Sequence, residues 1–154
     1  MKDLINKTLA SQAGFEALAL RLSIGLILTA HGSQKLFAWF GGYGLEGTGQ
    51  WMASVGLNPG YFMALLAGSG EFFPGIALML GLCTRPAAAI ASLTVAVALF
   101  WVHWGKGFFL TEQGIEYALA LLSATIALAI MGGGRYSLDH FLLESKIFGS
   151  NNND

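Results

Sequence analysis

Long apolar stretches alternate with short polar links along this chain, a pattern typical of membrane-spanning helices. The apolar stretches cover residues 17–39, 59–82, 87–104 and 112–131. A helix needs about 20 residues to cross roughly 30 Å of hydrocarbon, and each stretch is close to that length. Four such stretches in one chain predict a simple up-and-down order. The sequence therefore predicts an all-α membrane protein, built as a bundle of four transmembrane helices.

Turn residues mark where these helices begin and end. Asn58 offers an N-cap and Pro59 suits the first helical position, so the second span should begin there. Residues 83–86 form a tight link that joins the second and third spans into a helical hairpin. Thr111 can cap the fourth span, and the glycines at 132–134 end it.

Two segments outside the spans complete the predicted domain. The link 40–58 contains many glycines, yet its apolar side chains can gather on one side of a short helix. This predicts an interfacial helix in the first outer loop, with an apolar side made of Trp51, Met52, Val55 and Leu57. Residues 135–154 are predicted to be a polar tail. We expect residues 1–154 to form one transmembrane domain.

Composition excludes several classes of function. The chain is 55% hydrophobic and 11% charged, with a mean hydropathy of +0.60, which is too apolar for a soluble domain of 154 residues. Its net charge of -1 comes without basic runs, so we expect no nucleic-acid partner. Cys83 is the only cysteine, which excludes an internal disulfide, a dithiol redox pair and a thiolate zinc site. No metal centre is predicted.

Basic residues and tryptophans indicate the orientation, because the side of a membrane protein with more lysine and arginine is cytoplasmic. One side carries Lys2, Lys7, Arg85, Arg135 and Lys146, and the other carries Lys35 and Lys106. The tryptophans that an aromatic belt would require on the outer side are Trp39, Trp51, Trp101 and Trp104. We predict a bacterial inner-membrane protein with both termini in the cytoplasm. The alternative to a first span is a signal peptide, which the uncharged run 22–30 resembles.

Ionisable side chains inside the spans are the candidates for function. Such groups cost a few kcal/mol each on insertion scales, so they usually face the bundle interior and have a partner or a role. Those of this chain lie at several depths on the first, second, third and fourth spans. The candidate intramembrane site consists of Arg21, His31, Lys35, Glu71, His103 and Glu116.

Helical spacing predicts which face of each span points inward. Small residues beside the charges would let the helices approach closely. The predicted inward stripes are Arg21, Gly25, Leu28, Gly32 and Lys35 on the first span, Gly68, Glu71, Phe72, Gly75 and Met79 on the second, and Glu116, Ala120, Ser123 and Ala127 on the fourth. Pro74 cannot donate a hydrogen bond to the carbonyl of Gly70, so the second span should kink beside Glu71.

Each charged candidate can also be explained by a purely structural role. Arg21 could meet Glu71, either to hold the first two helices in register or as part of a site. Lys35 and Lys106 lie near the outer interface and are expected to snorkel toward water. Glu116 either favours the positive end of its own helix or belongs to the site.

The two histidines of the spans leave similar alternatives open. His31 and His103 are either interface residues hydrogen-bonded to their neighbours or contacts for a quinone or another small molecule. Two histidines at similar depth could also ligate a haem, but no motif supports this, so haem is disfavoured. His140, in the tail, is expected to have no functional role.

Several segments, in order and at matching spacing, resemble the DoxX family of membrane proteins. They are residues 21–36, 47–57, 71–72, 81–88, 116–119 and 132–139. The resemblance covers nearly the whole chain and implies a four-helix inner-membrane protein. The recurrent polar positions of the family match Arg21, His31, Lys35, Glu71 and Glu116.

The resemblance also implies a link to redox chemistry, because the family takes its name from a subunit associated with archaeal thiosulfate and quinol oxidation. A quinone needs an apolar slot with a donor or a proton carrier at each carbonyl. The region of His31, Glu71, His103 and Glu116 can supply these groups. Our leading hypothesis is an accessory membrane subunit of a quinone-linked oxidoreductase system, with quinone as candidate cofactor and oxidoreductase proteins or further copies of the chain as partners.

Two other functions stay open from the sequence. The chain could be a small carrier that binds an anion or another small molecule through Arg21 and Lys35. It could also be a scaffold or assembly partner whose buried charges only fix helix pairing.

Overall fold

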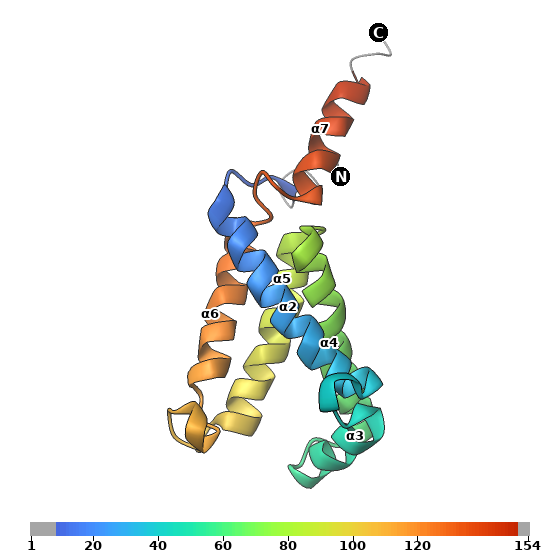
Figure 1. Cartoon of the computed structure of the whole chain (residues 1–154), viewed down its shortest axis with the longest axis vertical. Coiled ribbons are helices and arrows are strands. Elements are labelled where there is room, and N and C mark those ends of the chain that lie inside the picture. Colours follow the sequence, from blue (N-terminus) through green and yellow to red (C-terminus); the bar gives the residue numbers. More distant parts are fainter. Residues whose placement is uncertain (1–8, 151–154) are drawn as a thin grey trace.

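The computed structural model describes residues 9–150, which are helical apart from turns and links (Figure 1). The helices are α2 (Phe15–Phe37), α3 (Gly44–Ser54), α4 (Gly60–Leu80), α5 (Thr84–Val97), α6 (Glu116–Met131) and α7 (Leu138–Ser150). A π-helical turn, Ala98–His103, extends α5, and short 3₁₀ turns lie at Trp39–Gly41 and Leu110–Glu112. The predicted all-α fold is confirmed.

Length and hydropathy identify the membrane-spanning helices. Phe15–Phe37, Gly60–Leu80 and Thr84–His103, which joins α5 to its π-helical extension, are long and apolar enough to cross a bilayer. α6 is a shorter apolar helix that completes the bundle. The chain is therefore a multi-pass membrane protein. α3 is the short helix expected in the first outer loop, and it lies at the opposite end of the molecule from α7 (Figure 1).

Two helix boundaries differ from the prediction. α6 begins at Glu116 and not near residue 112, because Ile115 and Glu116 donate their N–H groups back to the carbonyls of Gly107 and Phe108, at 3.1 and 2.9 Å, and close a loop. The expected polar tail contains α7. The Ser137 hydroxyl accepts a 3.2 Å hydrogen bond from the N–H of His140, which is the geometry of a helix N-cap.

α2 and α4 cross at close range because glycines meet at their contact. A methyl group added at Gly25 would lie 2.7 Å from the carbonyl oxygen of Gly75, and one at Gly32 would lie 2.4 Å from the backbone nitrogen of Phe72. The predicted stripes on these two helices do face inward, with Arg21, Gly25, Leu28, Gly32, Gly68, Glu71 and Gly75 all buried. α4 continues as a helix through Pro74.

α6 turns a different face inward from the predicted one. Its buried residues are Ala118, Leu121, Thr125 and Leu128, whereas Ala120 and Ser123 are exposed. The predicted stripe of Glu116, Ala120, Ser123 and Ala127 was therefore wrong. The reason lies in the partner helix: α5 presents the small buried residues Ala87, Ala88 and Ala91, and Leu121 and Leu128 of α6 join them in the shared core.

At the end of the bundle that carries α7, side chains form hydrogen bonds with the free backbone groups of the helix termini. Asp139 is fully buried and accepts hydrogen bonds from the N–H groups of Cys83 and Thr84, at 2.6 and 2.8 Å, where α5 begins. Arg85 donates to the last carbonyls of α6. Helix ends leave such groups without intrahelical partners, so these bonds satisfy them. We call Arg21, Arg85 and Asp139 the helix-end cluster.

The basic residues named for the two sides and the tryptophans divide between the two ends as the sequence predicted, as far as the structure describes them. Arg85 and Arg135 lie at the end with the helix-end cluster, where Arg135 donates its N–H to Ala13. Lys35, Lys106 and the tryptophans lie at or near the end with α3, where the indole N–H of Trp101 donates to Val55. Lys2 and Lys7 lie outside the described residues, as does the side chain of Lys146.

Candidate functional site

An ion pair between α2 and α4 forms the centre of the candidate site. The Lys35 ammonium donates to the Glu71 carboxylate at 2.6 Å, and also to the backbone carbonyl of His31 at 3.4 Å. Only 23% of the Lys35 side chain and 11% of the Glu71 side chain are exposed. The prediction that Lys35 snorkels toward water was wrong. The stem of Lys35 packs on Gly68, one helical turn before Glu71, so its amine reaches the carboxylate.

A histidine and a tyrosine lie next to this pair. The Tyr117 hydroxyl is 3.4 Å from Nε2 of His31, and the two ring centroids are 6.1 Å apart. His31 precedes Lys35 by one turn of α2, so His31, Lys35, Glu71 and Tyr117 bring three helices together. We call these four residues the polar site. Sequence analysis missed Tyr117, although its position directly after Glu116 on the first turn of α6 could have indicated it.

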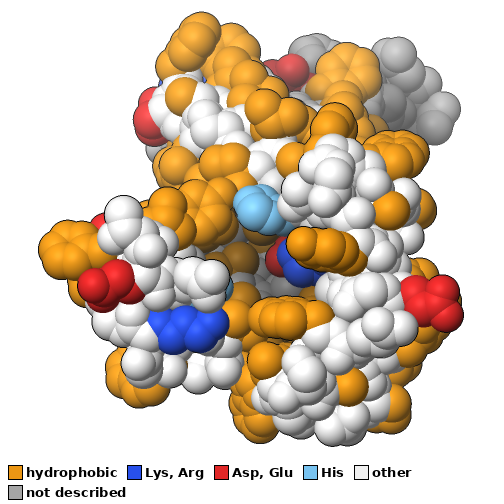
Figure 2. Space-filling model, turned by 60° about the horizontal axis from the view of Figure 1, so that its bottom comes forward, with side chains coloured by type: hydrophobic (Ala, Val, Ile, Leu, Met, Phe, Trp, Pro, Cys, Tyr) orange, Lys and Arg blue, Asp and Glu red, His pale blue; other side chains and the backbone are white. Residues whose placement is uncertain are grey.

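The surface near the polar site is hollowed. Figure 2 shows the end of the molecule that carries α3, where a basic side chain lies against an acidic one beside a hollow and a histidine lies at its rim. Among the described residues, Lys35 and Glu71 make the only ion pair of a lysine or arginine with a carboxylate. The pair is therefore largely buried yet reachable from this end.

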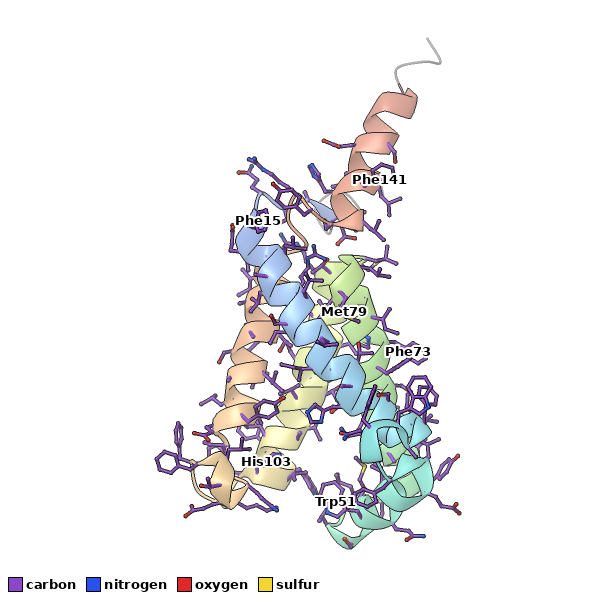
Figure 3. All side chains as sticks on the ribbon, in the orientation of Figure 1. Phe15, Trp51, Phe73, Met79, His103 and Phe141 are labelled. Atoms are coloured by element: carbon purple, nitrogen blue, oxygen red, sulfur yellow. The ribbon has the colours of Figure 1, made fainter. Side chains whose placement is uncertain are left out.

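Lys35 also lines a pocket of about 490 Å³ between the end of α2, the following turn and α3. We call it the α3 pocket. Its lining residues are Gln34, Lys35, Gly41, Gly42, Tyr43, Gly47, Thr48 and Trp51. Figure 3 shows Trp51 on the side of α3 that faces the end of α5, where His103 is labelled. Lys35 thus connects the polar site with a concave surface.

His103 and Glu116 lie at the end of the molecule that carries α3, but they hold the link between α5 and α6. Nδ1 of His103 lies 2.6 Å from the carbonyl oxygen of Gln113, and the Glu116 carboxylate accepts a 2.5 Å hydrogen bond from the N–H of Leu110. The exposed Lys106 amine donates to the Gln113 side chain at 3.1 Å. These contacts fix the link between α5 and α6. Within the described residues, no hydrogen bond joins His103 or Glu116 to Lys35 or Glu71.

Arg21 lies away from the polar site, so the expected pairing with Glu71 was wrong. Its guanidinium donates to the carbonyls of Leu78 and Met79 at 3.0 and 3.2 Å, and to that of Tyr136 at 2.7 Å. α2 and α4 run in opposite directions, which places Arg21 beside the end of α4 and Lys35 beside Glu71. Arg21 closes the C-terminal end of α4, as Arg85 does for α6.

Among the described residues, histidine, cysteine, aspartate and glutamate side chains form no group of three that could hold a metal ion. The polar site instead combines an ammonium, a carboxylate, an imidazole and a phenol. The ammonium, the imidazole and the phenol can donate hydrogen bonds to a ligand oxygen, and the carboxylate, the imidazole and the phenol can exchange protons with a ligand.

The chain is similar to known proteins over most of its length. The DoxX family profile matches residues 17–104. A protein of Bacillus subtilis named "Putative oxidoreductase CatD" is 33% identical over 129 residues, which cover 84% of this chain and 88% of that protein. An uncharacterized protein of Haemophilus influenzae is 34% identical over 128 residues, covering 79% of this chain and 86% of that protein. No solved structure matches. The chain belongs to the DoxX family of membrane proteins.

Proposed function

We propose that this chain is an inner-membrane accessory subunit of a quinone-linked oxidoreductase system, and that its polar site contacts the quinone. The observation that carries the proposal is the largely buried Lys35–Glu71 ion pair with His31 and Tyr117 beside it. Burying charges in a membrane bundle is costly, so such groups are functional-site candidates. The name of the Bacillus subtilis relative, an oxidoreductase, supports the same direction.

The chemistry of the polar site suits a quinone. A quinone carbonyl accepts a hydrogen bond from an ammonium or a phenol, and its reduction to a quinol takes up two electrons and two protons. The electrons would come from a partner oxidoreductase protein. Glu71, His31 and Tyr117 can hold or pass protons next to the ring oxygens. In this proposal the chain binds the quinone, and both of its termini face the cytoplasmic partner.

The carrier alternative has less support. It relied on Arg21 and Lys35 as free cations on one stripe of the first helix. Arg21 is bonded to carbonyls at the end of α4, and Lys35 is paired with Glu71. Arg21 is fully buried and donates to three carbonyls, and Glu71 neutralises the charge of Lys35, so neither cation is free to bind an anion.

The test is the quinone content of protein purified in mild detergent, measured by lipid extraction and by ultraviolet-visible spectroscopy. We expect wild-type protein to retain quinone, and Lys35→Met and Glu71→Gln to lose most of it. Glu144→Gln is the matched control, because Glu144 is paired with His140 outside the bundle. Variants as abundant as wild type but equally rich in quinone would exclude this site. Quinone-free wild-type protein that still captures defined partners would favour the scaffold alternative.

A further inference from the structure

The α3 pocket contains polar groups whose hydrogen-bonding capacity is not fully used. Lys35 carries three N–H donors, and the structure directs two of them to Glu71 and to the carbonyl of His31. Because Lys35 also lines the pocket, one donor stays available to a ligand there. The Gln34 amide donates to the carbonyl of Phe40 at 3.2 Å, and its side-chain oxygen remains an acceptor.

Thr48 is the most informative residue of the pocket. It is only 7% exposed, and its hydroxyl has no hydrogen-bond partner within the part of the chain that the structure describes. A threonine hydroxyl donates one hydrogen bond and can accept others, so this group keeps its full capacity for a ligand. The position is therefore one where a ligand atom that accepts or donates a hydrogen bond would be stabilised.

The remaining walls suit a flat, largely apolar ligand. Tyr43 and Trp51 contribute aromatic side chains, and glycines contribute bare backbone. Gly42 lies so close to α2 that an added methyl group would be 2.4 Å from Cα of Gln34, so the pocket wall depends on glycine there. The volume of about 490 Å³ is within the usual range for small-molecule sites, roughly 300–1,000 Å³.

We propose that the α3 pocket binds the ring of the quinone. The Lys35 ammonium and the Thr48 hydroxyl donate to ring oxygens, while Tyr43 and Trp51 cover the ring. This inference rests on the proposed function and adds the place of the ring and the residues that select it. The same ring chemistry can come from a membrane quinone with a long tail or from a tailless quinone that arrives from water.

The test measures quinone affinity by isothermal titration calorimetry on the full chain in detergent. The probes are duroquinone, which has no tail, and decylubiquinone, which has a ten-carbon tail. Both rings are fully substituted and therefore do not add to the Cys83 thiol. We expect Thr48→Val and Trp51→Leu each to raise the Kd about tenfold, equal to about 1.4 kcal/mol. Thr48→Ser, which keeps the hydroxyl, should bind like wild type.

Thr111→Val and Trp104→Leu are matched controls, because both residues are exposed in the link on the α5–α6 side. They should leave the Kd unchanged. Thermal unfolding monitored by circular dichroism checks that Thr48→Val and Trp51→Leu remain folded. A tenfold loss for both probes supports the pocket, because both carry the ring. A wild-type Kd much lower for decylubiquinone than for duroquinone then identifies a membrane quinone, and equal Kd values identify a tailless quinone from water.

The outcomes separate this inference from the proposed function. If Thr48→Val and Trp51→Leu bind both probes like wild type while Glu71→Gln does not, the ring lies elsewhere and the pocket is excluded. In that case the quinone-binding function stands. If the wild-type chain binds neither probe, both proposals are wrong.

Discussion

Asp139 and Thr84 lie 55 residues apart in the chain, yet the Asp139 carboxylate accepts a 2.8 Å hydrogen bond from the N–H of Thr84. The same carboxylate accepts from Cys83, so the segment after α6 provides the N-cap of α5. Replacing an N-cap residue by alanine costs about 0.5–2 kcal/mol. We expect Asp139→Ala to lower the free energy of unfolding by an amount in this range, and Asp139→Asn by less.

Denaturant titration of the detergent-solubilised protein, followed by circular dichroism, measures this change. Glu144→Ala serves as the control, because Glu144 lies on α7 but is exposed and paired only with His140. Equal unfolding midpoints for Asp139→Ala and wild type would show that the cap contributes nothing measurable.

The contacts of Arg21 predict a structural role. The two terminal nitrogens of the guanidinium donate to different carbonyls, one at the end of α4 and one at Tyr136. A lysine has a single ammonium nitrogen and could not reach both carbonyls at once. Arg21→Lys should therefore destabilise the protein by about 1–3 kcal/mol. The folded fraction should keep the wild-type Kd for duroquinone. A weakened Kd with unchanged stability would instead place Arg21 in the quinone site.

The close contact of α2 and α4 depends on Gly32. A methyl group there would lie 2.4 Å from the backbone nitrogen of Phe72, and the backbone cannot yield as a side chain does. We expect Gly32→Ala to cost about 1–3 kcal/mol of stability, as other overpacked cores do. Ser23→Ala, on the exposed side of the same helix, is the control, and its unfolding midpoint should match wild type. Midpoints that coincide for the two variants would contradict a tight helix crossing.

The predicted orientation can be tested through Cys83, which is exposed and is the only cysteine. If the end with the helix-end cluster faces the cytoplasm, a membrane-impermeant maleimide should label Cys83 in inverted vesicles and not in intact spheroplasts. A Cys83→Ser chain with Thr111→Cys, at the other end, should give the opposite pattern. Labelling of Cys83 in intact spheroplasts would reverse the assigned topology.

The sequence predicted the helices better than their contacts. Hydropathy located the spans, because a membrane helix needs a long apolar run whatever its neighbours are. The inward faces of α2 and α4 were also predictable, since glycines and charges shared one stripe. The face of α6 was not, because α6 lacks such markers and its packing depends on the small residues that α5 supplies.

The site was predicted only in part, for a geometric reason. His31, Lys35 and Glu71 were candidates and lie together. The wrong partner was assigned to Glu71 because estimates of depth on separate helices do not show how far a long side chain turns back along its own helix. Lys35 reaches inward past His31, so it pairs with Glu71 and Arg21 does not. The sequence did not indicate Thr48 or Asp139 as candidates, because the pocket that Thr48 lines and the helix end that Asp139 caps are formed by residues distant in the chain.

The helix-end cluster also bears on how the protein is made. Arg21 donates to the carbonyl of Tyr136, which comes 115 residues later in the chain, and the start of α5 is capped by Asp139. Since the ribosome delivers the chain from its N-terminus, the first three spans leave the ribosome before either partner does. The bundle can only be locked after translation has passed Asp139, and a chain that stops earlier leaves the end of α4 and the start of α5 without these hydrogen bonds.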